Sequence, residues 1–260
     1  MSKSTIKVSH YQEMASGTGG RKGRDYKGLP ILANRGIHEF VAAHLSKCLK
    51  PGSHLLELGS GSGALSLRLA ELGFRVTAVD YVAENFRASH DNIDFKQADL
   101  NADLPESERE AYDAVVAVEI IEHLENTRHF TRLLKSALKP GGFLMITTPN
   151  INSPKSAMTF LLTGRFDLFL PRHYVKDGHI NPVPWFVMRD ALEEAGFEEI
   201  SVGSHKSAAF SLKGIFGAAF QLLGLFNGSP KGKKLVATAI KPGGKKAGCG
   251  TGCGCAHTSP

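Results

Sequence analysis

A short apolar segment that runs directly into a glycine-rich loop constrains this chain of 260 residues more than any other feature. Residues 54–58 have the pattern of a buried strand, and Gly-Ser-Gly-Ser-Gly follows at 59–63. Glycines at alternate positions after a strand let the backbone approach a ligand closely. Two interpretations fit this loop. With Ala64 it is the G-x-G-x-x-A loop of a dinucleotide site, whereas with Glu57 it is an acidic residue before G-x-G-x-G, which suits a nucleoside without a pyrophosphate.

Strand and helix patterns alternate along the rest of the chain, which predicts an α/β fold with a parallel sheet and helices on both faces. Apolar residues recur at helical spacing in four segments, 34–49, 65–72, 127–139 and 185–195. Strand-like segments follow the glycine loop at 74–80, 93–98, 112–118, 143–148, 199–203 and 235–240. Ligands of such sheets bind beyond the carboxyl ends of the strands. Besides the loop, those ends carry Asp80, Asp99 and Glu119.

Composition divides the chain into three parts. Residues 1–30 are polar, basic and rich in glycine, and we expect them to form a flexible arm. Residues 31–241 form the predicted domain, which includes an apolar insert at 208–228. Residues 242–260 form a tail rich in glycine and cysteine. With 42% hydrophobic residues, the chain can bury one sizeable core.

The net charge of +6 is concentrated at the two ends of the chain. Residues 1–27 carry a net +4 and residues 227–260 a net +6, so the middle of the chain is net negative. We interpret the ends as solvated termini, with contact to an anionic membrane surface as the alternative. This placement of charge does not favour a nucleic-acid partner. No apolar run is long enough to span a bilayer and the first residues lack the apolar segment of a secretory signal, so we expect a cytoplasmic protein.

Four features decide between the two interpretations of the loop. Glu57 would repel a pyrophosphate but would favour an ammonium group. Asp99 and Leu100 follow the third strand, where a side-chain acceptor could hold an adenine amino group. The other two features are the sequences VEIIEHLEN at 118–126 and LKPGGFLMITTPN at 138–150. Over about residues 34–203 and the last strand, this set resembles the class I S-adenosylmethionine-dependent methyltransferases, and among them the branch that includes the ubiquinone-biosynthesis O-methyltransferases.

The resemblance implies a Rossmann-like, seven-stranded methyltransferase sheet whose last strand is inserted antiparallel, and S-adenosylmethionine as the cofactor. The residues that would bind the cofactor all lie at or beside strand ends: Glu57, Gly59, Ser60, Gly61, Gly63, Asp80, Tyr81, Asp99, Leu100 and Glu119. By the same resemblance, the glycines line the methionine part and Asp80 holds the ribose. Asp99 and the backbone of Leu100 would hold adenine. Glu119 would border the methionine end, and Glu57 could instead brace the loop backbone.

His123 and Glu122 are the predicted catalytic residues. Methyl transfer from a sulfonium requires alignment of donor and acceptor, and a hydroxyl acceptor also requires a base that takes its proton. His123 lies just past the fourth strand beside Glu122 and is the first candidate for that base. Two alternatives stay open. Glu119, Glu122 and His123 could bind a divalent metal, a pattern found in some ubiquinone-type O-methyltransferases, or the glutamates could merely favour a helix N-terminus.

The predicted acceptor is a small molecule, with its hydroxyl methylated and an apolar or lipid-like body. In the fold implied by the resemblance, the region after the fifth strand builds the acceptor pocket, here residues 150–184. This region contains His173 and His179 among several aromatic residues. The segment 208–234 combines the apolar insert with lysines, which predicts either peripheral membrane contact or a lid helix on the pocket. The alternative functions are an NAD-dependent oxidoreductase and a non-catalytic cofactor-binding module, and the sequence does not indicate an oligomeric state.

A separate metal site is predicted in the tail. Its candidate ligands are Cys249, Cys253, Cys255 and His257, in a segment whose glycines leave the backbone free to wrap an ion. Three thiolates and an imidazole suit zinc or a softer ion such as Cu(I). The spacing is not that of a usual zinc finger, so the alternative is a disordered tail with unused thiols.

Overall fold

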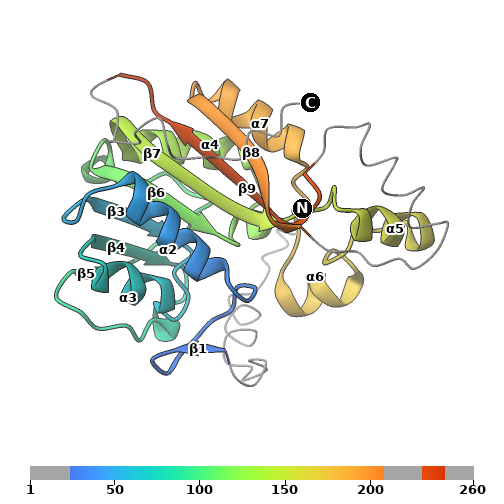
Figure 1. Ribbon diagram of the computed structural model, residues 1–260, viewed down its shortest axis with the longest axis horizontal. Helices are drawn as coiled ribbons and strands as arrows, with labels where there is room; N and C mark the ends of the chain where they lie inside the picture. The colour runs from blue at the N-terminus through green and yellow to red at the C-terminus, as the bar shows by residue number, and fades with distance from the viewer. Residues whose placement is uncertain (1–23, 208–229, 244–260) are drawn as a thin grey trace, which may run out of the picture.

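The computed structural model describes residues 24–207 and 230–243. Its centre is a seven-stranded sheet in the order β5-β4-β3-β6-β7-β9-β8 (Figure 1). The strands are β3 (His54–Leu58), β4 (Arg75–Asp80), β5 (Ile93–Gln97), β6 (Tyr112–Val118), β7 (Leu138–Pro149), β8 (Glu198–Ser207) and β9 (Gly232–Ile240). Neighbours from β5 to β7 pair in parallel, and β9 pairs antiparallel with both β7 and β8. The predicted sheet and its antiparallel last strand are therefore confirmed.

Helices cover both faces of the sheet, because successive residues of a buried strand point to opposite sides. On one face, α2 (Ile37–Cys48) and α3 (Ala64–Glu71) pack on Ala114 and Val116 of β6. On the other face, α4 (Thr127–Ala137) and α7 (Trp185–Glu194) pack on Val115 and Ala117. Both faces of this strand are thus buried, which explains why residues 114–118 are continuously apolar rather than alternating.

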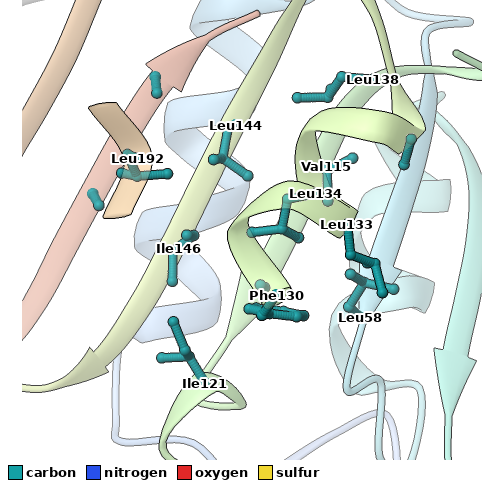
Figure 2. Packing of buried hydrophobic residues seen from close by; sticks show 14 of the residues in the cluster. Leu58, Val115, Ile121, Phe130, Leu133, Leu134, Leu138, Leu144, Ile146 and Leu192 are labelled. Atoms are coloured by element: carbon teal, nitrogen blue, oxygen red, sulfur yellow. The ribbon is translucent and has the colours of Figure 1, made fainter. Parts of the chain in front are cut away.

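Figure 2 shows the second of these cores, in which Phe130 and Leu134 of α4 face Val115 and Leu144 of the sheet. Phe130, Leu134 and Leu144 have no exposed surface. Full burial of a side chain of this size contributes about 1.5–3 kcal/mol relative to exposure. The start of α4 is fixed by Asn126, whose side chain accepts a hydrogen bond from the backbone N–H of His129 at 3.0 Å. The packing of α4 on the sheet and the hydrogen bond at its start together position the loop before α4, which carries the candidate catalytic residues.

The connection before β7 differs from the prediction. The sequence predicts a helix over 127–139 and a strand over 143–148, but α4 ends at Ala137 and β7 already begins at Leu138. The pairing of β6 with β7 shifts register between Tyr112 and Ala114, which accommodates the bend. A Cβ on Gly142 would lie 2.8 Å from the carbonyl oxygen of Lys139, so a glycine is required for the close packing here.

Two helices in the region 150–184 were not predicted by apolar periodicity. They are α5 (Pro154–Thr163) and α6 (Pro171–Asp177), and Figure 1 shows them grouped on the side of the molecule opposite β5 and α3. Each begins with a proline in its first turn and ends at a glycine in the left-handed conformation, Gly164 and Gly178. These are ordinary start and stop signals for a helix. They were present in the sequence, but the helices are too exposed to show a regular apolar stripe.

The folded part of the chain begins before residue 31, which corrects the expected boundary of the arm. Two short strands, β1 (Asp25–Tyr26) and β2 (Leu29–Pro30), pair antiparallel. The hydroxyl of Tyr26 donates a hydrogen bond to Glu71 of α3 at 2.5 Å, and the Arg68 guanidinium lies 4.0 Å from the centre of the Tyr26 ring. Residues 24–30 are therefore attached to α3 rather than free.

Several predictions fall on parts of the chain outside the described residues. They concern residues 1–23 of the arm, the apolar insert at 208–228 and the four proposed metal ligands of the tail, Cys249, Cys253, Cys255 and His257. Among the helices that the structure describes, none is long and apolar enough to cross a membrane.

Candidate functional site

The glycine loop between β3 and α3 has a backbone that only glycine adopts without strain. Gly59, Gly61 and Gly63 have φ angles of 77°, 53° and 81°. A Cβ on Gly59 would lie 2.8 Å from Ile120, and one on Gly63 would lie 2.5 Å from Ala88. At Gly61 the nearest atom to such a Cβ is 3.6 Å away, on the exposed side chain of Leu32. The first and last glycines are thus needed for packing, whereas the middle one leaves room for a ligand.

Asp80 lies at the end of β4 and holds the loop in place. Its Oδ2 accepts a hydrogen bond from the Gly61 N–H at 2.7 Å, and its Oδ1 accepts one from the Val82 N–H at 3.0 Å. The next residue, Tyr81, is 39% exposed. Ser60 is buried, and its Oγ has no hydrogen-bond partner among the described residues. A buried hydroxyl without a partner is costly, and a polar ligand would satisfy it.

Glu57 is buried at the end of β3 and faces α3. Ser66 of that helix donates a hydrogen bond from its Oγ to Glu57 Oε2 at 2.5 Å. Burial raises the pKa of Glu57 to about 8, against the lowering effect of Ser66, and the charge of Asp80 raises it further. This contact fits the bracing role that the sequence left open. A role of Glu57 toward the cofactor's ammonium group stays a prediction.

The proposed adenine end of the site lies after β5. Asp99 Oδ1 accepts a hydrogen bond from the Asn101 N–H at 2.9 Å, and Leu100 is buried. The side-chain oxygen of Asn101 accepts a hydrogen bond from the Glu125 N–H at 3.0 Å. This end of the site is therefore tied to the loop after β6, although the two are separated by more than twenty residues in sequence.

Glu119 follows β6 with a φ of 55°, in the left-handed region that non-glycine residues rarely adopt. Thr147 of β7 donates a hydrogen bond to its Oε1 at 3.1 Å, and Lys234 of β9 forms an ion pair with its Oε2. Lys234 is 4% exposed. The sequence analysis did not identify Lys234 as a site residue, because only the insertion of β9 beside β7 brings it to Glu119.

Glu119 and Glu122 do not share a helix face, as the alternative metal set of Glu119, Glu122 and His123 would require. A 3₁₀ turn, η3 (Ile121–His123), begins two residues after Glu119, whose backbone conformation breaks the helical path. Glu122 instead accepts a hydrogen bond at its Oε2 from Thr148 at 2.9 Å, and it is fully buried. Among the described residues, the candidate ligand atoms that come together instead belong to Glu122, His123 and His179, all within 4.8 Å of one another.

Burial shifts the pKa values of this cluster. It lowers the pKa of His123 to about 4, and the neighbouring His179 lowers it further. It also lowers the pKa of His179. The pKa of Glu122 is raised to about 7, again because of burial. Both imidazoles are thus neutral at physiological pH and can offer a lone pair to a proton or a metal ion.

The seven-stranded sheet with its antiparallel β9 and the glycine loop after β3 together define the class I methyltransferase fold. A family model described as a methyltransferase domain matches residues 32–202. The chain therefore belongs to the methyltransferase domain family.

Curated relatives share part of their length with this chain. The mitochondrial ubiquinone biosynthesis O-methyltransferase of Mus musculus is 35% identical over 154 residues, which cover 55% of this chain and 41% of that protein. The ubiquinone biosynthesis O-methyltransferase of Xanthomonas campestris pv. campestris (strain B100) is 30% identical over 148 residues, which cover 54% of this chain and 60% of that protein. The chain thus spans less than two thirds of the length of these relatives.

Solved structures show the same fold at low sequence identity. An S-adenosylmethionine-dependent methyltransferase from Archaeoglobus fulgidus is 20% identical, with a TM-score of 0.55 over 80% of this chain and 96% of that one. A putative methyltransferase from Haloferax volcanii, in complex with the Trm112 activator, is 15% identical, with a TM-score of 0.58 over 92% of this chain and 100% of that one.

Proposed function

We propose that this protein transfers the methyl group of S-adenosylmethionine to a hydroxyl of an apolar or lipid-like small molecule. One observation carries the proposal: the loop after β6 presents Glu122 and His123 at the same sheet edge as the glycine loop that follows β3. A cofactor on the glycine loop would therefore have its methionine end beside two groups able to take a proton.

The cofactor half of the proposal is supported by the free space at Gly61 and by two polar groups around it. Ser60 Oγ lacks a partner among the described residues, and Asp80 lies at the position from which the family holds the ribose. The NAD-dependent alternative is set aside by membership of the methyltransferase domain family. The non-catalytic module remains the rival, since cofactor binding does not by itself imply turnover.

The acceptor half is supported by an apolar surface on α5 and α6. Phe160, Leu161 and Leu162 of α5 are 45%, 71% and 77% exposed, and Tyr174 and Val175 of α6 are also exposed. A monomeric protein does not usually leave so many large apolar side chains uncovered in one region. The surface suits an apolar acceptor or the membrane in which such an acceptor would dissolve. The curated relatives are named ubiquinone biosynthesis O-methyltransferases, which is consistent with an acceptor of this class.

The proposed reaction is the transfer of a methyl group to a hydroxyl that lies beside Glu122 and His123. Bound S-adenosylmethionine would supply its methyl group to the hydroxyl oxygen, and the S–CH₃ bond would be exchanged for an O–CH₃ bond with loss of the hydroxyl proton, to give S-adenosylhomocysteine and a methyl ether. Glu122, with its pKa raised to about 7 by burial, is better matched to take that proton near neutral pH than His123, with its pKa of about 4. We therefore assign the proton to Glu122 and the orientation of the acceptor to His123.

The test is methyl transfer from labelled S-adenosylmethionine to two matched acceptors, a catechol with a long alkyl chain and catechol itself. We expect label in the alkylated compound and far less in the plain one. Binding of S-adenosylhomocysteine without transfer to either compound would favour the non-catalytic module. Equal transfer to both would contradict the apolar acceptor and leave the methyltransferase activity standing.

We also propose a peripheral membrane contact through residues 208–234, most of which lie outside the described residues, for a protein of the cytoplasm. Co-sedimentation with anionic and with neutral vesicles tests it. Binding to the anionic vesicles is expected, and no binding to either kind would contradict the contact.

A further inference from the structure

We propose that Glu122, His123 and His179 bind a divalent transition-metal ion, with His179 in the place that the sequence pattern would give to Glu119. The proposal deepens the proposed function, on which its role depends, because the ion would lie beside the acceptor hydroxyl. Bound there, a divalent ion would lower the pKa of that hydroxyl, and Glu122 would then act as a ligand of the ion rather than as the base that takes the proton. Binding of the ion itself depends only on the side chains of Glu122, His123 and His179 and the groups that hold them.

The first support is the arrangement of the two histidines. His123 Nδ1 lies 3.1 Å from the carbonyl oxygen of Gly178, and His179 Nδ1 lies 2.8 Å from that of Leu168. A carbonyl oxygen can only accept, so Nδ1 carries the proton in both rings and Nε2 keeps its lone pair. Donation of the second ring nitrogen to a carbonyl is the usual support of a metal-binding histidine.

The second support is an unsatisfied atom of Glu122. Its Oε2 is bonded to Thr148, but its Oε1 is buried and has no hydrogen-bond partner among the described residues. The side chain has no exposed surface. A buried carboxylate oxygen without a partner is costly, and a cation in the cluster would supply the missing interaction.

The third support is the way in which His179 is held. The carbonyl oxygen of Glu122 accepts hydrogen bonds from the N–H groups of Ile180 and Asn181, both at 3.0 Å. The chain around His179 is therefore fastened to the turn that carries Glu122 and His123. Leu168, whose carbonyl orients His179, has a φ of 67°, which costs energy for a leucine. A strained backbone conformation of this kind persists only where the surrounding structure enforces it.

Glu119 is excluded from this site by Lys234. The ammonium group of Lys234 forms an ion pair with Oε2 of Glu119, and the hydroxyl of Thr147 donates a hydrogen bond to Oε1. Both carboxylate oxygens therefore already have partners. Removing the lysine from a buried pair would leave an uncompensated charge. A metal ion would have to displace Lys234 to reach Glu119, whereas nothing among the described residues occupies the atoms that Glu122, His123 and His179 offer.

The ligand set indicates the kind of ion. Two imidazoles and one carboxylate suit Mn²⁺, Fe²⁺, Co²⁺ or Zn²⁺ better than Mg²⁺ or Ca²⁺, which prefer oxygen ligands. Ligand atoms about 3.4 Å apart surround an ion at bond lengths near 2.1 Å. The three ligand atoms lie within 4.8 Å of one another, so at most a small inward rotation of the side chains would bring them to this spacing.

The test is binding of Mn²⁺ to the full chain, followed by the electron paramagnetic resonance signal of the free ion, with no cofactor or acceptor present. Mn²⁺ is chosen because the tail thiolates bind it poorly. We expect one bound ion, and an affinity at least tenfold lower in His179→Gln. The matched control is His173→Gln, a buried histidine whose ring centre lies 6.3 Å from that of His179 but which is outside the cluster. It should retain the affinity.

Two outcomes would overturn the proposal: no Mn²⁺ binding by the unaltered protein, or loss of binding in Glu119→Gln but not in His179→Gln. Unchanged binding of S-adenosylhomocysteine and an unchanged melting temperature in each variant show that it is folded. Because no methyl transfer is measured, a failure here leaves the proposed function standing. Conversely, metal binding without methyl transfer to any acceptor would contradict the proposed function alone.

Discussion

The ammonium group of Lys234 on β9 forms a buried ion pair with Glu119, which directly follows β6. The two residues are separated by more than one hundred positions in sequence, and β7 lies between their strands in the sheet. Their contact exists because Lys234 is paired with Pro149 at the end of β7, so that its side chain reaches the loop after β6. Of the two buried or half-buried glutamates of this loop, Glu119 is thus paired with a cation, whereas Glu122 has no cationic partner among the described residues.

Replacing Asp80 should weaken the binding of the cofactor without unfolding the protein. Asp80→Ala removes the proposed contact with the ribose and the hydrogen bond to Gly61, which at 2.7 Å fixes the loop. We expect a loss of about 1–3 kcal/mol in the binding of S-adenosylhomocysteine, the usual cost of losing a hydrogen bond to a charged group. Calorimetric titration measures it, and an unchanged affinity would contradict the ribose assignment.

Replacing His123 should affect turnover far more than cofactor binding. His123→Ala removes the ring that we assign to acceptor orientation, and we expect a fall in kcat of about 10²-fold, the scale for misplacing a reacting group. Binding of S-adenosylhomocysteine should stay within twofold. A proportional fall in both quantities would show that His123 is structural.

Glu57 should make stability depend on pH. Its pKa is about 8 in the folded protein because of burial, well above the ordinary value of 4.5. Between these two values the folded state keeps a proton that the unfolded state has lost, so stability falls as pH rises from about 4.5 to 8. Each unit of the shift is worth about 1.4 kcal/mol.

Urea unfolding of the unaltered protein and of Glu57→Gln at pH 5 and pH 8 tests this dependence. The glutamine retains an acceptor for the Ser66 hydroxyl. We expect the unaltered protein to lose about 3–4 kcal/mol relative to the variant between the two pH values. A parallel pH dependence in both proteins would show that Glu57 is ionised in the folded state.

Gly63 should tolerate no side chain. Gly63→Ala would meet Ala88 at 2.5 Å, whereas Gly52→Ala, at a similar φ of 85°, would meet no atom within 4 Å. Both variants should lose about 1–2 kcal/mol through the left-handed backbone. The clash should cost Gly63→Ala about 1–3 kcal/mol more. Equal free energies of unfolding of Gly63→Ala and Gly52→Ala in urea would mean that the glycine loop moves away from Ala88 without cost.

The tail prediction can be separated from the site near His179 by truncation. We expect the full chain to bind more zinc or Cu(I) than a chain ending at Lys246, because only the former carries Cys249, Cys253, Cys255 and His257. Metal content after purification without chelators measures the difference. Equal contents in the two proteins would end the idea of a tail site.

The sequence by itself determined the local elements and the class of protein. It predicted β3 and β6 to the residue, because apolar runs and the glycine loop are encoded by adjacent positions. The resemblance, carried by short motifs at the strand ends, added the seven-stranded order with its antiparallel β9. These features depend on contacts within a strand, a turn or one motif.

Only the tertiary structure decided which side chains meet at the site. Spacing suggested that Glu119, Glu122 and His123 share a face, but the left-handed backbone at Glu119 turns its carboxylate toward Lys234. The chain after α6 then supplies His179 instead. Such partners come from strands and loops that are distant in sequence. Their meeting is set by the order of the sheet and the direction of each loop, which no local pattern records.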